Sequence, residues 1–119
     1  MENTNLLTHR NTNLDINKIE SRMEKFLEKF TNLTKDEKKN LRYALIELSK
    51  GMYYNKCSLR DYKKHLRELD SNKTMNPGYR IKCMFYTLNQ IHQVRRTMTF
   101  IMHRYNEYVT DYTKLNEKT

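Results

Sequence analysis

The chain has 119 residues and a net charge of +9, with 37% hydrophobic and 31% charged residues. This length predicts one domain with a lean core, and no apolar run approaches the roughly 18 residues of a membrane span. A positive charge of this size favours nucleic acid, an anionic membrane or an acidic protein surface as the partner, and says nothing about the fold. A helix that lies on a membrane usually carries Trp or Leu opposite a lysine-rich face, and the chain has no Trp, so we expect no membrane partner.

The first residues are polar. Residues 1–13 contain no apolar core, so we expect a flexible tail without a signal peptide, followed by a single helical domain over residues 14–119. The two cysteines, Cys57 and Cys83, stand in no metal-binding motif and are interpreted as buried free thiols. We therefore expect an intracellular protein, cytoplasmic or, in a eukaryotic host, nuclear, that holds no metal and no cofactor.

Two helices are expected first. Apolar residues spaced three and four apart predict a helix over 15–31 that packs against another helix. These residues are Ile16, Ile19, Met23, Phe26, Phe30 and Leu33. Thr34 and Glu37 form a capping-box pattern that predicts a second helix over 35–50. Gly51 is typical of the left-handed residue that follows a helix, so we expect that helix to end there.

A loop and a third helix are expected next. Residues 52–57 are predicted to be the loop, and the cap pattern of Ser58 and Asp61 predicts a helix over 59–70. The second and third helices leave a helix-turn-helix open as an interpretation, with residues 58–70 as its recognition element. The loop between them is longer than the three or four residues usual for that motif.

The fourth helix is predicted over 77–114, because Asn76 and Pro77 suit the cap and the first turn. Its expected inward side is broken only by Arg95 and otherwise consists of Ile81, Met84, Leu88, Ile91, Met98, Met102, Tyr105, Val109 and Tyr112. A straight helix of this length would be roughly 57 Å long. We therefore expect either a bend near 95–99 or a projecting helix that pairs with another chain through residues 81–112, in a homo-oligomer or with a different partner. The fold class is all-α, a small bundle of four or five helices with antiparallel neighbours.

One face of this helix carries polar residues that could act on a substrate. His92, Arg96, Thr99 and His103 share it at spacings of 4, 3 and 4. Arg96 and His103 are separated by six residues and resemble the Arg-x4–6-His motif of the HEPN ribonucleases, small all-helical domains in which the Arg and His act on RNA at a dimer interface. That family usually has Asn, Asp or His after the Arg, where this chain has Thr97. The resemblance implies a helical ribonuclease, whereas the residues alone favour polar side chains on an exposed helix flank.

Positive charge is concentrated in the C-terminal two thirds of the chain. Residues 1–34 are neutral by count, and no acid lies between Asp70 and Glu107. Arginines can bind phosphates bidentately and exposed tyrosines can stack on unpaired bases. We predict as nucleic-acid-binding residues Arg60, Lys63, Lys64, Arg67, Lys73, Arg80, Lys82, Arg95, Arg96 and Arg104.

These patterns predict a small basic binding protein that contacts nucleic acid, RNA or DNA, or a nucleoprotein complex of which it is a subunit. No Gly-rich phosphate loop, nucleophile motif or paired carboxylates indicate an enzyme, so we predict no catalytic residues. One alternative is a protein-interaction module with an acidic partner, such as a phage or viral factor that binds a host protein. Heavy use of Asn, Lys and Tyr, which have A- and T-rich codons, fits such an AT-rich genome. The other alternative is the helical ribonuclease.

Overall fold

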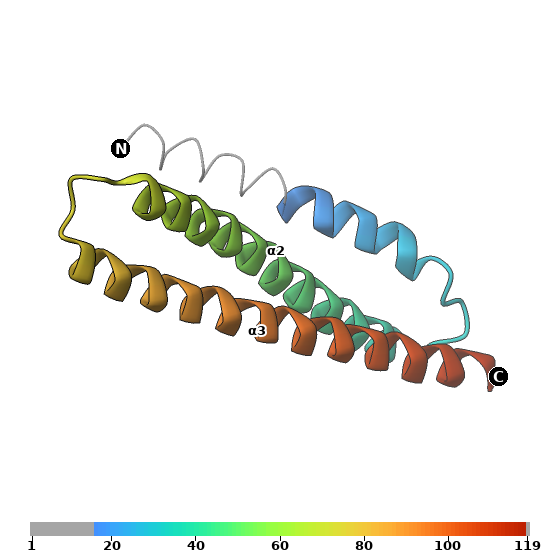
Figure 1. Cartoon of the computed structure of the whole chain (residues 1–119). Helices are drawn as coiled ribbons and strands as arrows, with labels where there is room; N and C mark the ends of the chain where they lie inside the picture. The colour runs from blue at the N-terminus through green and yellow to red at the C-terminus, as the bar shows by residue number, and fades with distance from the viewer. Residues whose placement is uncertain (1–15, 119) are drawn as a thin grey trace. The chain divides into compact units, whose positions relative to one another are not determined.

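The computed structural model describes residues 16–118. Over this range all regular secondary structure is helical: a helical segment at residues 16–27, α2 at Lys35–Ser71 and α3 at Pro77–Glu117 (Figure 1). The all-α prediction is confirmed. The predicted count of four or five helices is wrong, because the described residues form three. The predicted tail, residues 1–13, lies outside the described residues.

The start of α2 follows the capping box that the sequence predicts. The Thr34 N–H donates to Glu37 Oε1 at 2.8 Å, and the Glu37 N–H donates to Thr34 Oγ1 at 3.1 Å. Two of the backbone donors that a helix leaves unpaired at its N-terminus are thereby satisfied. Asp36 and Glu37 also place negative charge in the first turn, where the helix dipole favours it.

The predicted end of this helix at Gly51 is wrong. α2 continues through the expected loop at 52–57 and through the expected cap at Ser58 as far as Ser71. Gly51 has no positive φ, so it is an ordinary helical residue. A Cβ built on Gly51 would lie 3.3 Å from Ile101 Cδ1. The glycine therefore lets α2 approach α3 closely. The helix-turn-helix interpretation is wrong, because α2 is continuous where that motif needs a turn.

The link between α2 and α3 is held by asparagine side chains. Asn72 Oδ1 accepts hydrogen bonds from the Thr74 N–H at 3.1 Å, the Thr74 hydroxyl at 2.8 Å and the Met75 N–H at 3.2 Å. Asn76 Oδ1 accepts from the Tyr79 N–H at 3.1 Å, and Pro77 is the first residue of α3. The predicted cap and first turn of this helix are confirmed.

Contacts divide the described residues into two compact units, residues 16–50 with 104–118 and residues 51–103. The described part of the first unit has a continuous apolar core. Its buried members are Met23, Leu27, Phe30, Leu41, Leu45 and Ile46, with Phe26, Leu33, Tyr105, Val109 and Tyr112 packed against them. Burial raises the pKa of Tyr105 above its usual value of 10.0.

Polar contacts at the surface of the first unit join segments that are distant in sequence. Asn32 bonds to Asn116 through two hydrogen bonds of 2.9 and 3.1 Å, Arg42 pairs with Glu24, and Lys50 Nζ lies 3.6 Å from Glu20 Oε1. All of these groups are partly or largely exposed, so the ion pairs contribute little to stability. The free energy of folding of this unit therefore comes chiefly from its apolar core.

The second unit is a hairpin made of the C-terminal part of α2 and the N-terminal part of α3 (Figure 1). Only Leu69, Thr87 and Ile91 are buried in it. Thr87 fits there because its hydroxyl donates to the Cys83 carbonyl at 2.9 Å, which satisfies its polar group. The remaining inward positions are half-buried, so the hairpin has a thin core.

The predicted inward side of α3 is partly wrong in this unit. Ile81, Leu88, Arg95 and Met102 are exposed, and the residues just before them, Arg80, Thr87, Val94 and Ile101, face inward instead. The predicted bend at 95–99 does not interrupt the helix. Here the Thr97 and Thr99 hydroxyls donate to the carbonyls of Gln93 and Arg95, both at 3.1 Å.

Candidate nucleic-acid interface

The positive charge of the chain belongs mainly to the second unit. Residues 51–103 contain ten Lys and Arg against three Asp and Glu, so they carry +7 of the net +9. In the first unit, by contrast, acids are almost as frequent as bases, and ion pairs such as Arg42–Glu24 join them. An anionic ligand is therefore attracted to the second unit.

Five of these cations share one face of α2, which we call the α2 basic face. Its members are exposed and recur at the 4-3-1-3 spacing of a single helical face: Lys56, Arg60, Lys63, Lys64 and Arg67. Four of them are sequence-predicted site residues. Lys56 was missed because residues 52–57 were expected to form a loop, which gave Lys56 no place on a helix face.

Carboxylates leave this face largely unneutralised. Arg60 Nε lies 3.6 Å from Asp61 Oδ1, and both side chains are about two-thirds exposed, so water screens the pair. For the other four members of the α2 basic face, no carboxylate of residues 16–118 lies within ion-pair distance. The face thus presents solvated ammonium and guanidinium groups that phosphates can approach.

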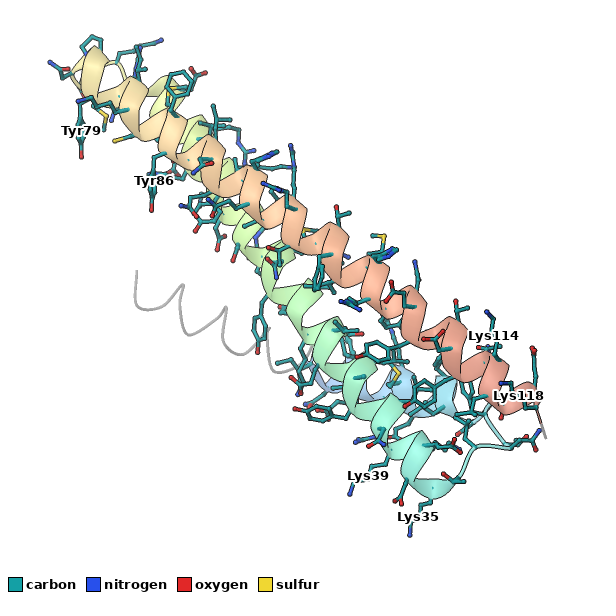
Figure 2. All side chains as sticks on the ribbon, turned by 90° about the horizontal axis from the view of Figure 1, so that it is seen from below. Lys35, Lys39, Tyr79, Tyr86, Lys114 and Lys118 are labelled. Atoms are coloured by element: carbon teal, nitrogen blue, oxygen red, sulfur yellow. The ribbon has the colours of Figure 1, made fainter. Side chains whose placement is uncertain are left out.

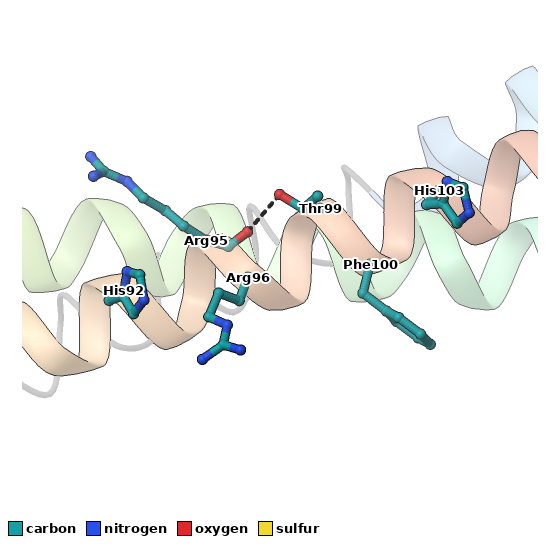
Figure 3. Close-up of a pocket in the computed structure, with 6 residues that line it drawn as sticks. All are labelled: His92, Arg95, Arg96, Thr99, Phe100 and His103. Carbon is teal, nitrogen blue, oxygen red and sulfur yellow. Dashed lines mark hydrogen bonds between the residues drawn. The ribbon is translucent and has the colours of Figure 1, made fainter.

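A shallow hollow of about 620 Å³ lies on α3, and we call it the α3 hollow. Its lining side chains all come from three turns of this one helix: His92, Arg95, Arg96, Thr99, Phe100 and His103. Figure 3 shows Arg95 extended to one side of the helix, with Arg96 and the Phe100 ring on the other. No acid lines the hollow, so its electrostatic character is set by the two arginines.

Arg95 illustrates how the structure changes a sequence prediction. The apolar spacing placed it among inward residues, yet Arg95 is exposed and Val94 faces inward in its place. The Arg95 guanidinium therefore keeps its contact with water, and it needs no buried acid to offset a cost of desolvation. The guanidinium is available at the surface of the α3 hollow.

The α2 basic face and part of the α3 hollow lie on the same side of the hairpin. Each of Lys56, Arg60, Lys63 and Arg67 directly follows an inward or half-buried residue of α2, and His92, Arg95 and Thr99 directly follow inward residues of α3. One residue further along a helix is about 100° further round it. In two antiparallel helices that face each other, residues one position after the inward residues point to the same side of the pair on both helices. The four cations of α2 and the three residues of α3 therefore share one side of the hairpin.

The other predicted site residues are spread over different positions. Lys73 is exposed in the link and Lys82 is exposed on α3. Arg80 is half-buried: its Nη1 donates to the Asn72 carbonyl at 3.1 Å, and its Nε is buried without a partner in the described residues. Arg104 belongs to the first unit, where its Nη1 lies 3.2 Å from Glu107 Oε2. Arg80 therefore supports the hairpin end rather than the exposed basic surface.

The residues of the HEPN resemblance all line the α3 hollow, but they are arranged along a single helix. Arg96 and His103 are seven positions apart, which corresponds to about 10 Å along the axis. The hollow supplies two imidazoles, two guanidiniums, a hydroxyl and a phenyl ring. Such groups can bind phosphates and stack on planar ligands.

No protein-family model matches the chain, and none of the curated proteins or solved structures is detectably similar to it. Within residues 16–118, no helix is both long and apolar enough to cross a membrane. In the same range, no three His, Cys, Asp or Glu side chains lie close enough together to hold a metal ion.

Proposed function

We propose that this chain is a non-catalytic binding protein that contacts nucleic acid through its second unit, alone or as a subunit of a nucleoprotein complex. The observation that carries the proposal is the α2 basic face, five exposed cations on one side of a helix with a single, exposed carboxylate partner. Cations that neutralise phosphates release condensed counterions, so they favour binding strongly at low salt.

The test is a salt titration of RNA and DNA binding. The face variant replaces Lys56, Lys63, Lys64 and Arg67 by Gln. The control variant removes the same charge from the first unit by replacing four exposed lysines: Lys35 and Lys39 of α2, Lys114 of α3, and Lys118, which directly follows α3 (Figure 2). For every phosphate that the variant no longer neutralises, the log–log salt slope should become shallower by about 0.9 on duplex DNA and about 0.7 on single strands.

We expect the face variant to bind more weakly than the control variant and to have a shallower log–log salt slope. Both variants should retain their helical circular dichroism. Equal losses in the two variants would mean that net charge alone, and not the α2 basic face, attracts the nucleic acid. No binding at low salt would overturn the proposal and leave an acidic protein as the partner. RNA cleavage by the wild type that His103→Ala abolishes while binding persists would show an enzyme instead.

A second function, association through α3, is favoured by a separate observation. Ile81, Phe85 and Leu88 are 50%, 67% and 45% exposed and line, with Met84, an apolar hollow of about 300 Å³. We propose that residues 81–112 contribute to self-association or to binding of a protein partner, since exposed apolar patches mark interaction surfaces. Sedimentation at increasing concentration tests it: Phe85→Glu should lower the association constant, and a wild type that stays monomeric throughout would exclude a homo-oligomer.

A further inference from the structure

The α3 hollow is lined mainly by flat side chains. Of its six lining residues, five end in a planar group: the imidazoles of His92 and His103, the guanidiniums of Arg95 and Arg96, and the phenyl ring of Phe100. The Phe100 side chain is 58% exposed although it is large and apolar. Aromatic rings and guanidinium planes are the surfaces on which proteins stack unpaired bases.

These planar groups are spaced too widely for the bases of a duplex. His92, Arg96 and Phe100 are each four residues apart, and His103 follows three residues later. Four residues correspond to a rise of about 6 Å, whereas stacked bases in a duplex strand are separated by about 3.4 Å. A strand that places bases on successive groups must therefore have those bases unstacked from one another, which only a single strand allows.

Charge complementarity identifies the occupant of the hollow. Arg95 and Arg96 lie among the planar groups (Figure 3), and the sequence has no acid between Asp70 and Glu107. An acidic protein helix would also be attracted, but its carboxylates are not each accompanied by a flat group, whereas every nucleotide of a strand carries both a phosphate and a flat base. A duplex could bring phosphates to the arginines, but its bases would stay inside the helix and out of reach of Phe100.

We propose that the α3 hollow is a stacking platform for unpaired bases, so that the second unit binds single-stranded nucleic acid in preference to duplex. This inference rests on the proposed function and assigns its ligand class. Phosphates lie against Arg95 and the α2 basic face on the same side of the hairpin, while bases lie on Arg96, Phe100 and the imidazoles. Every base has a flat face, so recognition depends little on sequence.

The decisive variant is Phe100→Leu, which keeps the side chain apolar and the helix intact but removes the ring. The matched control is Tyr43→Leu, which removes a ring that is 70% exposed on the part of α2 in the first unit. Binding is measured by fluorescence anisotropy with a labelled oligouridylate and with a blunt RNA duplex of the same length. Circular dichroism checks that each variant remains helical.

We expect Phe100→Leu to weaken binding of the single strand by about fivefold or more, the lower end of the range for one stacked base. Duplex binding and both salt slopes should stay unchanged, because no charge is removed. Tyr43→Leu should change neither. Arg96→Lys should also weaken single-strand binding at an unchanged slope, since it keeps the charge and loses the guanidinium plane.

Two results would overturn the inference while leaving the proposed function in place. One is equal affinity of Phe100→Leu and wild type for the oligouridylate, with the α2 face variant still flattening the salt slope. The other is an equal loss of single-strand and duplex binding in Phe100→Leu. If the wild type bound neither the oligouridylate nor the duplex at low salt, both proposals would be overturned.

Discussion

Replacing Gly51 by alanine tests whether α2 is continuous through its middle. If Gly51 ended a helix in a left-handed conformation, as its sequence context suggests, a Cβ would strain the backbone and alanine would destabilise the protein. In the structure Gly51 is helical without a positive φ. Alanine is then the better helix former by about 1 kcal/mol, so the two arrangements predict opposite signs.

The contact with α3 reduces this gain. A Cβ on Gly51 would lie 3.3 Å from Ile101 Cδ1, slightly closer than an ordinary van der Waals contact. That methyl group is the end of a flexible, half-buried side chain and can shift by a few tenths of an ångström, at a cost of several tenths of a kcal/mol. We therefore expect Gly51→Ala to raise the free energy of unfolding by about 0.5 kcal/mol and Tm by about 2–4 °C.

Urea and thermal unfolding of four proteins measure the effect: wild type, Gly51→Ala, Ile101→Val and the double variant. Ile101→Val removes the contacting methyl, so Gly51→Ala should gain more in that background, close to the full 1 kcal/mol. Destabilisation by Gly51→Ala in both backgrounds would refute the argument. It would indicate a helix end at Gly51 and restore the predicted loop.

Three further predictions concern stability. Leu45→Ala should lower the free energy of unfolding by about 2–5 kcal/mol, because Leu45 is fully buried; Leu88→Ala, at a half-exposed position, is the control in urea unfolding and should cost far less. Asn76→Ala should cost about 1 kcal/mol in the same assay, since the Tyr79 N–H at the start of α3 loses its acceptor. The raised pKa of Tyr105 makes its stability contribution complete below pH 10.0 and lost as pH rises through the folded-state pKa. The free energy of unfolding of Tyr105→Phe should therefore fall less above pH 10.0 than that of the wild type. The same decrease in both proteins above pH 10.0 would contradict this reasoning.

Helix starts were predictable from sequence because capping is local. Thr34 and Glu37 satisfy each other's backbone donors, Asn76 accepts from the Tyr79 N–H, and Pro77 has the φ of a first helical residue. All of these partners lie within three residues, so no distant segment is needed to predict them. Gly51 misled the prediction because the same residue suits a helix end or a close approach of two helices. Only the position of Ile101 on another helix decides between these roles.

The inward side of α3 was ambiguous for a similar reason. Residues 81, 88 and 102 are apolar, and so are residues 94 and 101, so two neighbouring stripes can each be read as the buried one. In the structure the stripe that contains Thr87 is the buried one, and Thr87 can be buried because its hydroxyl donates to the Cys83 carbonyl. A spacing rule that counts only apolar residues cannot anticipate this.

The candidate site was predictable to the extent that it depends on helical spacing. Arg60, Lys63, Lys64 and Arg67 were predicted as binding residues within the helix expected over 59–70, and they lie together on the α2 basic face. The role of Arg80 at the end of the hairpin was not predictable, because it depends on the Asn72 carbonyl that the folded link presents. Both outcomes follow from whether a residue's surroundings are set by its own helix or by another segment.

The uneven burial along α2 and α3 has a consequence for hydrogen exchange. Six of the buried hydrophobic residues form the core of the first unit, whereas Leu69 and Ile91 are the buried hydrophobic residues of the second. The free energy of local opening follows the apolar area buried, so amide protons in residues 51–103 should exchange faster than those in residues 35–50. The part of the chain that carries the basic surface is then also the part that opens most readily, and a bound strand would register first as slowed exchange there.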